Sequence, residues 1–158
     1  MTQDYISYIR SKVGHDKIML TFAGGILTDD AGRILLQKRG DFGKWGLPGG
    51  AMELGESSLE TAIREFAEET GIKVTAKRLL NVYTNSEHHY LNGDICQSIT
   101  FIYEMVAEES YDISAHRDDE SLELRFFTKE EIDQLALAFD SHRLMIEEYV
   151  SGSFAMGH

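Results

Sequence analysis

The 158-residue chain has little cysteine, little proline and no long apolar run. Its single cysteine, Cys96, cannot form a disulfide within the chain. A free thiol of this kind is typical of a reducing compartment, which predicts a cytoplasmic location. No stretch reaches the roughly 20 apolar residues that a membrane span needs, and the amino terminus lacks the apolar core of a secretion signal. We therefore expect no membrane partner.

Basic residues are also scarce. The chain has 15 lysines and arginines against 27 aspartates and glutamates, and its formal net charge is −12. Binding to a nucleic-acid backbone needs a positive surface, so this balance argues against a DNA or RNA partner. An anionic small molecule would need cations to neutralise its site. The length fits one domain with its own core, which we assign to residues 1–150, followed by a flexible tail at 151–158.

What the chain does contain is an acidic segment with helical periodicity, within residues 50–72. Ser57 and Ser58 can cap the start of a helix, because their hydroxyl oxygens accept from unpaired backbone N–H groups. Gly71 suits the position just past the end, where a left-handed backbone is easiest without a Cβ. Apolar residues recur at i, i+3, i+4 and i+7 and predict the buried stripe of this helix: Leu59, Ala62, Ile63 and Phe66.

Three glutamates share another face of the predicted helix, because Glu65, Glu68 and Glu69 are spaced i, i+3 and i+4. Like charges at that spacing destabilise a helix by roughly 0.2–0.5 kcal/mol per pair. A hard divalent cation such as Mg²⁺ or Mn²⁺ prefers carboxylate oxygens and would turn the repulsion into coordination. On the helix alone, a solvated acidic face explains the glutamates equally well.

The residues flanking these glutamates favour the metal site. The segment has the spacing G-x5-E-x7-R-E-U-x-E-E-x-G-U, where U is apolar, and it resembles the signature of the Nudix hydrolase family. The U position after Glu65 is usually aliphatic in that family and is Phe66 here, which we interpret as a variation in core packing. The preceding segment LPGG, at 47–50, also resembles the family. The signature positions are filled by Gly50, Glu56, Arg64, Glu65, Glu68, Glu69 and Gly71.

The resemblance implies an α/β fold, specifically a Nudix-type α/β/α sandwich with a mixed central β-sheet. Residues 17–28 and 33–38 are expected to form two strands that a turn at 29–32 joins into a hairpin. Apolar and β-branched patterns predict further strands at 74–84, 95–107 and 121–127. Additional helices are expected at 2–13, from Thr128 through Leu135, and after a cap at Ser141.

The same resemblance implies the roles of the signature residues. Glu65, Glu68, Glu69 and the carbonyl of Gly49 would hold the metal, and either Glu65 or Glu69 would act as general base.

Around this metal shell the resemblance places supporting residues. Arg64 would orient the carboxylates and Glu56 would pair with it, although a plain salt bridge is the alternative. A further acidic ligand often comes from a later loop in the family, and our choice for it is Glu120.

Two pairs of residues outside the signature are further candidates for the site. Lys38 and Arg39 lie at the edge of the expected site and could bind substrate phosphate oxygens, with surface solvation as the equal alternative. His88 and His89 are adjacent, so their rings should point apart, and we do not expect a shared zinc site. A substrate-contacting loop over residues 85–94 is the better functional interpretation of that segment.

Family members hydrolyse the diphosphate linkage of nucleoside diphosphates joined to another moiety. The resemblance therefore predicts a metal-dependent hydrolase of a small-molecule nucleotide, of the nucleotide-sugar or ADP-ribose type. Two alternatives stay open: a nucleoside triphosphate pyrophosphohydrolase of the sanitising type, and a non-catalytic nucleotide-sensing module. Sensors of that kind tend to lose signature carboxylates, whereas this chain keeps all of them. A homodimer is compatible with the apolar side of the amino-terminal helix.

Overall fold

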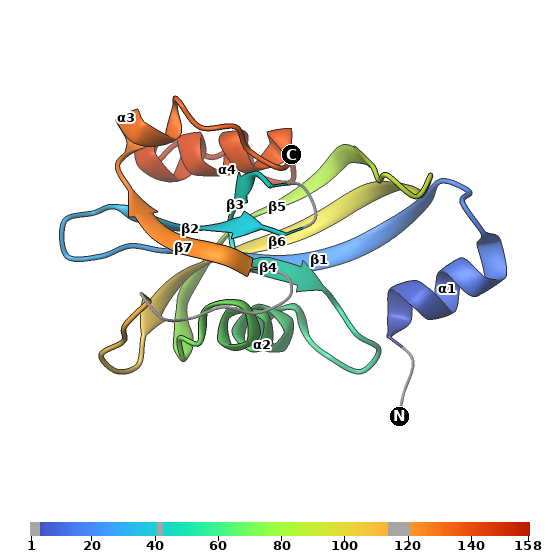
Figure 1. Cartoon of the computed structure of the whole chain (residues 1–158), viewed down its shortest axis with the longest axis horizontal. Helices are drawn as coiled ribbons and strands as arrows, with labels where there is room; N and C mark the ends of the chain where they lie inside the picture. Colours follow the sequence, from blue (N-terminus) through green and yellow to red (C-terminus); the bar gives the residue numbers. More distant parts are fainter. Residues whose placement is uncertain (1–3, 41–42, 114–120) are drawn as a thin grey trace.

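The computed structural model describes residues 4–40, 43–113 and 121–158. Within these residues, two β-sheets form the centre of the molecule (Figure 1). The larger sheet has the order β4-β1-β6-β5 and consists of Gly49–Ala51, Ile18–Leu27, Ile95–Ala107 and Val74–His89. β1 runs parallel to β6, and the other neighbours are antiparallel, so the predicted mixed sheet is confirmed.

The smaller sheet is antiparallel and has the order β3-β2-β7, formed by Trp45–Gly46, Ile34–Arg39 and Ser121–Phe127. Helix α2 (Ser58–Thr70) covers one side of the two sheets, and α3 (Lys129–Ile132) and α4 (Asp140–Ser151) cover the other (Figure 1). The predicted α/β/α sandwich is therefore confirmed. None of the helices in the described ranges is long and apolar enough to cross a membrane.

The core has two parts, one on each side of the sheets. Successive residues of β2 point to opposite sides, because side chains alternate along a strand. Leu36 belongs to the cluster under α3 and α4, with Ile132 and Met145, whereas Leu35 belongs to the cluster under α2, with Phe66. All of these side chains are buried. The central strand of the smaller sheet thus presents residues to both layers, including the layer that contains the signature helix.

The pairing predicted for the first two strands is wrong. β1 and β2 meet only at the isolated bridge between Thr28 and Ile34 and then enter different sheets. The turn itself forms as expected, since the Asp29 carboxylate accepts from the backbone N–H groups of Ala31 and Arg33. A local turn signal thus identified the turn, but the strand partners come from distant segments, β6 for β1 and β7 for β2.

The signature helix has the ends that the sequence predicts. Ser57 is the N-cap and forms a capping box with Glu60, in which each side chain accepts from the other residue's backbone N–H. Gly71 ends the helix in a left-handed conformation, with φ of 74°. Both caps satisfy backbone groups that a helix terminus would otherwise leave unpaired. Of the predicted apolar stripe, Ala62 and Phe66 are fully buried, whereas Leu59 is 37% exposed.

Other boundaries differ from expectation. β5 continues to His89, so residues 85–89 extend the strand and the turn begins at Tyr90. α3 ends at Ile132 instead of Leu135, and Ser141 lies inside α4 rather than capping it. The long pairing of β5 with β6 stabilises extended backbone in a polar segment that has no apolar pattern of its own.

Two peripheral segments contact the sheets. α1 (Tyr5–Val13) lies beside the larger sheet, and none of the nine residues of this helix is buried (Figure 1). The residues after α4, which we expected to form a flexible tail, are hydrogen-bonded to β5: Gly157 N–H donates to Asn81 Oδ1 and Thr84 N–H donates to the carbonyl of His158.

Candidate active site

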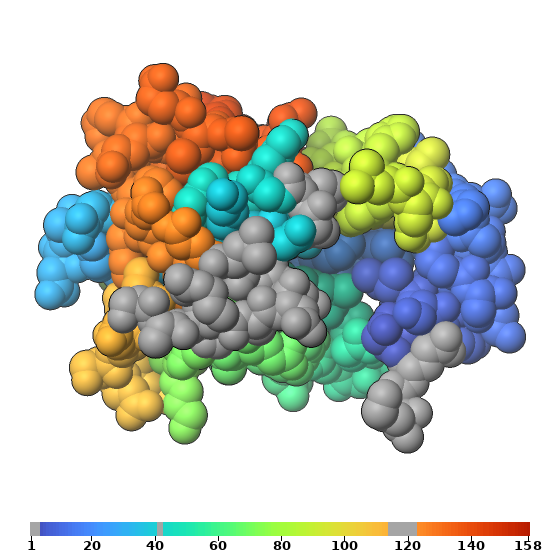
Figure 2. All heavy atoms as spheres, in the orientation of Figure 1, coloured from blue at the N-terminus to red at the C-terminus, as the bar shows by residue number. Residues whose placement is uncertain are grey.

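A cleft of about 710 Å³ lies where α2, β4, the β5–β6 hairpin, α1 and the start of α4 meet. Figure 2 shows the surface hollowed between α1, at the right edge of the view, and the body of the molecule. The size is within the usual range for small-molecule sites. The cleft brings together six of the residues expected from the sequence: Arg39, Gly49, Arg64, Glu65, Glu68 and Glu69.

Arg64 connects the signature helix to the loop before it. Its Nη1 donates to Glu65 at 2.9 Å, its Nη2 donates to the carbonyl of Ala51 at 3.2 Å, and both carboxylate oxygens of Glu56 accept from its remaining donors. The hydrogen bonds from Arg64 lower the pKa of Glu56 to about 2, and those to Glu56 raise the pKa of Arg64. Both groups are therefore charged at neutral pH.

The carboxylate of Glu65 packs against the backbone of β4. A Cβ at Gly50 would lie 2.4 Å from the carboxyl carbon of Glu65, much closer than atoms can approach. Glu65 is only 8% exposed. A residue without a Cβ at this position therefore leaves room for the carboxylate of Glu65 beside β4.

Glu69 is the most enclosed of the signature glutamates, at 2% exposure. Its Oε1 accepts from the backbone N–H of Gly49 at 2.8 Å, and its Oε2 accepts from Nε2 of Gln37 at 2.6 Å. Burial raises the pKa of Glu69, and the neighbouring charge of Glu65 adds to this rise, while the donor groups of Gln37 and Gly49 oppose it. Sequence reasoning did not select Gln37, although it is a polar residue that follows three buried apolar residues of β2.

The donor set suits a hard cation, although its side chains are not already grouped around one. Within the described ranges, no three His, Cys, Asp or Glu side chains are grouped closely enough to hold an ion. Glu65 and Glu69 are nevertheless two buried carboxylates of like charge, and carboxylate oxygens are the preferred ligands of Mg²⁺ and Mn²⁺. The side chain of Glu68 is 56% exposed and contacts Arg64 only at 3.3 Å, so it is free to turn. Glu120 lies outside the described residues.

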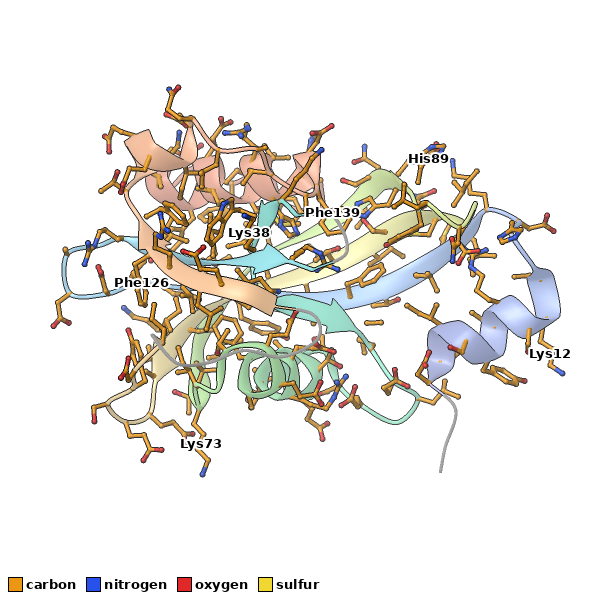
Figure 3. All side chains as sticks on the ribbon, viewed as in Figure 1. Lys12, Lys38, Lys73, His89, Phe126 and Phe139 are labelled. Atoms are coloured by element: carbon orange, nitrogen blue, oxygen red, sulfur yellow. The ribbon has the colours of Figure 1, made fainter. Side chains whose placement is uncertain are left out.

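The two basic residues expected near the phosphates are placed differently. Arg39 lines the cleft, but Lys38 does not. Lys38 lies on the side of the smaller sheet that faces α4 (Figure 3). The pairing of β2 with β7 shifts in register between Lys38 and Arg39, and the guanidinium of Arg39 lies against Phe139 at the start of α4.

The wall that contains Arg39 also contains aromatic rings. The rings of His88 and Phe139 are stacked with centroids 4.5 Å apart, and the guanidinium carbon of Arg39 lies 5.2 Å from the centroid of Phe139. Figure 3 shows Phe139 where the chain enters α4. The ring of His89, by contrast, is exposed and hydrogen-bonded to Glu87, so the two adjacent histidines point apart. Arg39 and the segment that contains His88 were expected near the substrate, whereas no motif indicated Phe139, which joins them only through the fold.

His142 supports this wall from α4. Its Nδ1 accepts from the backbone N–H of Leu47 at 3.1 Å, just before the glycines of the signature. Burial, together with the charges of Arg39 and His88, lowers the pKa of His142 to about 3. The imidazole is therefore neutral at pH 7 and acts as a hydrogen-bond acceptor.

The far end of the cleft is formed by the β5–β6 hairpin and α1. Tyr90, Asn92 and Asp94 line the cleft from the hairpin, within the segment that we interpreted as substrate-contacting. Polar contacts hold α1 in place: Tyr5 N–H donates to Glu53 at 2.9 Å, and Arg10 donates to the carbonyl of Ile95 at 2.8 Å and pairs with Asp94 at 3.5 Å.

The mixed α/β sandwich thus places the carboxylates of one helix beside a strand with two adjacent glycines, at one cleft. The family profile described as NUDIX domain matches residues 21–149. The chain therefore belongs to the Nudix family, as its signature predicts.

Named relatives and a solved structure agree with this assignment. The chain is 35% identical over 129 residues to an ADP-ribose pyrophosphatase of Methanocaldococcus jannaschii, a match covering 80% of this chain and 70% of that protein. It is 39% identical over 74 residues to a putative 8-oxo-dGTP diphosphatase of Bacillus subtilis, covering 44% of this chain and 50% of the relative. A NUDIX hydrolase crystal structure from Nitrosomonas europaea has a TM-score of 0.64 at 27% identity and covers 87% of this chain and 75% of that one. Some matching curated relatives are covered over half of their length or less.

Proposed function

We propose that this chain is a hydrolase that cleaves the pyrophosphate linkage of a nucleoside diphosphate joined to another moiety, with Mg²⁺ or Mn²⁺ as the required ion. One observation carries the proposal: α2 places Glu65, Glu68 and Glu69 along one wall of a 710 Å³ cleft. Like charges would not be gathered in this way for folding alone, because two of them are buried and repel each other.

The ion, when bound, would neutralise charge on the pyrophosphate oxygens and make a water molecule more acidic. The three glutamates and the carbonyl of Gly49 would hold it. Arg64 fixes Glu65 through the hydrogen bond at 2.9 Å. Glu65 and Glu69 are the two candidates for accepting the proton of the attacking water, since both line the cleft and carry a carboxylate within it.

The opposite wall would bind the rest of the substrate. Arg39 offers a guanidinium, whose donors match phosphate oxygens in a forked geometry. The aromatic rings of His88 and Phe139 suit the flat face of a nucleobase or the apolar face of a sugar. The residues of the β5–β6 hairpin would then lie near the moiety attached beyond the pyrophosphate.

A substrate of the ADP-ribose or nucleotide-sugar type is the preferred choice. The match to the protein named ADP-ribose pyrophosphatase extends over 129 residues and thus includes segments outside the signature. The second candidate is a nucleoside triphosphate, which the match to the protein named putative 8-oxo-dGTP diphosphatase favours over 74 residues. The two candidates differ in what occupies the far end of the cleft.

The deciding experiment is a substrate panel with the purified chain. ADP-ribose, UDP-glucose, dGTP and 8-oxo-dGTP are each incubated with Mg²⁺ or Mn²⁺, and the products are separated by ion-exchange chromatography. ADP-ribose should give AMP and ribose 5-phosphate, and a triphosphate substrate would give a monophosphate and pyrophosphate. Tight nucleotide binding without any cleavage would overturn the proposal and indicate a sensing module instead.

A further inference from the structure

Gln37 occupies a position where folding alone would favour an apolar residue. It lies on β2, the central strand of the smaller sheet, with its backbone paired to Gly46 on one side and Leu124 on the other. The residue is completely buried, as are the two leucines before it. A buried amide is unfavourable unless its donors and acceptor are all hydrogen-bonded.

The amide of Gln37 meets that condition only in part. Its Nε2 donates to Glu69 Oε2, but its Oε1 is buried and has no hydrogen-bond partner among the residues that the structure describes. An aliphatic side chain of similar size would fill the same space without an unpaired acceptor. The amide therefore does not owe its place to core packing, and what it contacts is the enclosed signature glutamate.

Gln37 and Gly49 together fix the carboxylate of Glu69. The two donors come from different strands, β2 and β4, and each oxygen of the carboxylate accepts from one of them. A glutamate side chain has several rotatable bonds, so its backbone on α2 cannot by itself determine where the carboxylate points. Two donors on rigid strands can determine that direction. Hydrogen bonds of this kind also favour the charged carboxylate, which is the form that binds a cation.

We propose that Gln37 is a positioning residue that holds Glu69 oriented and ready to bind a divalent cation. This inference rests on the proposed function, because it assigns to Gln37 a role in the same ion site. Groups that orient metal ligands from behind typically change metal affinity or activity by about 10–100-fold when they are removed.

The test compares Gln37→Met with a matched control. Methionine keeps the unbranched length of glutamine and removes both hydrogen-bonding groups. The control is Gln97→Met on β6, because Gln97 donates to the carbonyl of Thr84 at 2.9 Å and does not line the cleft. For each protein we would measure Mn²⁺ affinity by electron paramagnetic resonance without nucleotide, kcat and KM at saturating Mg²⁺, and Tm.

We expect Gln37→Met to weaken Mn²⁺ binding or lower kcat by about 10–100-fold. KM for the nucleotide should change little. Tm should also change little, because the substitution removes one unpaired buried acceptor, Gln37 Oε1, and leaves another, Glu69 Oε2, without its donor. Gln97→Met should bind Mn²⁺ like the natural chain. The inference would be overturned if Gln37→Met kept the Mn²⁺ affinity and the kcat of the natural chain. It would also be overturned if these two quantities fell only in proportion to a fall in Tm.

A second substitution, Gln37→Leu, guards against a packing defect specific to methionine. If neither apolar variant shows a cooperative thermal transition, the amide serves folding and the inference is wrong. The Mn²⁺ measurement needs no substrate, so the outcome is separate from that of the substrate panel. A chain that binds Mn²⁺ through this site but cleaves nothing would refute the proposed function and leave the comparison of the Gln37 variants intact.

Discussion

Arg64 binds both carboxylate oxygens of Glu56, with Nε 2.7 Å from Oε2 and Nη2 2.8 Å from Oε1. The two residues are separated by eight positions, one on α2 and the other in the loop that leads into it. The remaining nitrogen of the guanidinium, Nη1, contacts Glu65. One side chain thus connects the conformation of the loop to the position of a carboxylate in the cleft, which explains why the arginine and the first glutamate occur together in the signature.

Replacing Arg64 with lysine should weaken both the fold and the activity. A lysine ammonium cannot form the forked pair of hydrogen bonds with a carboxylate. Hydrogen bonds to charged groups contribute roughly 1.5–3 kcal/mol, so we expect the free energy of unfolding to fall by about 1–3 kcal/mol, together with a lower turnover rate. Urea unfolding and a steady-state assay would measure the two effects.

A suitable control for this substitution is Arg33→Lys. Arg33 also donates from Nε to a carboxylate, that of Asp29, but its side chain is 49% exposed and lies away from the cleft. Exposed ion pairs contribute little, about 0–1 kcal/mol. If Arg64→Lys and Arg33→Lys had the same small effect, the connecting role of Arg64 would be wrong.

The adjacent glycines of β4 should respond differently to alanine. A Cβ at Gly50 overlaps the carboxylate of Glu65, the end of a side chain that can move aside. A Cβ at Gly49 overlaps backbone instead, 2.7 Å from the carbonyl oxygen of Ala23. Overlap with backbone cannot relax without moving a strand.

We therefore expect Gly50→Ala to keep most of its stability and to lose Mn²⁺ affinity, and Gly49→Ala to lose stability. Thermal unfolding and electron paramagnetic resonance of Mn²⁺ would separate the two effects. The opposite assignment, with Gly50→Ala unfolding and Gly49→Ala losing only the ion, would contradict the geometry of β4.

Glu69→Gln should abolish turnover while the protein stays folded. The new amide keeps the volume of the carboxylate and an oxygen that can accept from Gly49 N–H. Its NH₂ group can donate to Gln37 if the amide of Gln37 turns over, since Oε1 of Gln37 is a buried acceptor with no partner in the described parts of the chain. The change thus removes the charge and preserves the hydrogen bonds.

Circular dichroism and the hydrolysis assay at saturating Mg²⁺ would check this result. Glu147→Gln is the matched control, because Glu147 is exposed on α4. Undiminished activity of Glu69→Gln would refute the role assigned to this glutamate.

Features that depend on neighbours in the sequence could be predicted, and those that depend on distant segments could not. The caps of α2 and the turn at Asp29 follow from local hydrogen bonding. The partner of β1 could not be predicted, because the nearest strand in sequence enters the other sheet.

The residues of the candidate site also fall into those that local sequence predicts and those that depend on distant segments. The glutamates follow from one signature on one helix, whereas the wall formed by Arg39, His88 and Phe139 exists only after three distant segments fold together. Gln37 stands out in the sequence only as a polar residue that follows a run of apolar ones. Its role could not be predicted, because its hydrogen-bond partner, Glu69, is 32 positions away in the sequence.

The partly buried histidine of α4, His142, should make the stability of the protein fall in mild acid. The pKa of His142 is lowered from an ordinary value of 6.5 to about 3 by burial and by the nearby charges of Arg39 and His88. Between these two pH values the unfolded chain binds a proton at this position and the folded chain does not. Stability therefore rises with pH across this window, and it is lost as pH falls below 6.5. His88 shares this direction, since burial lowers its pKa too, while Asp140 opposes the shift of His88.

His142→Asn should flatten this dependence. The side-chain oxygen of asparagine can accept from Leu47 N–H in place of Nδ1, and it has no proton to gain in this range. We would measure the free energy of unfolding in urea at pH 7, 6, 5 and 4 for both proteins. The natural chain should lose stability more steeply than His142→Asn between pH 6.5 and 4, whereas the effect of Glu56, whose pKa is lowered to about 2, is common to both. Parallel curves would mean that His142 takes up its proton in the folded state near the ordinary pKa, and would contradict the lowered pKa assigned to it.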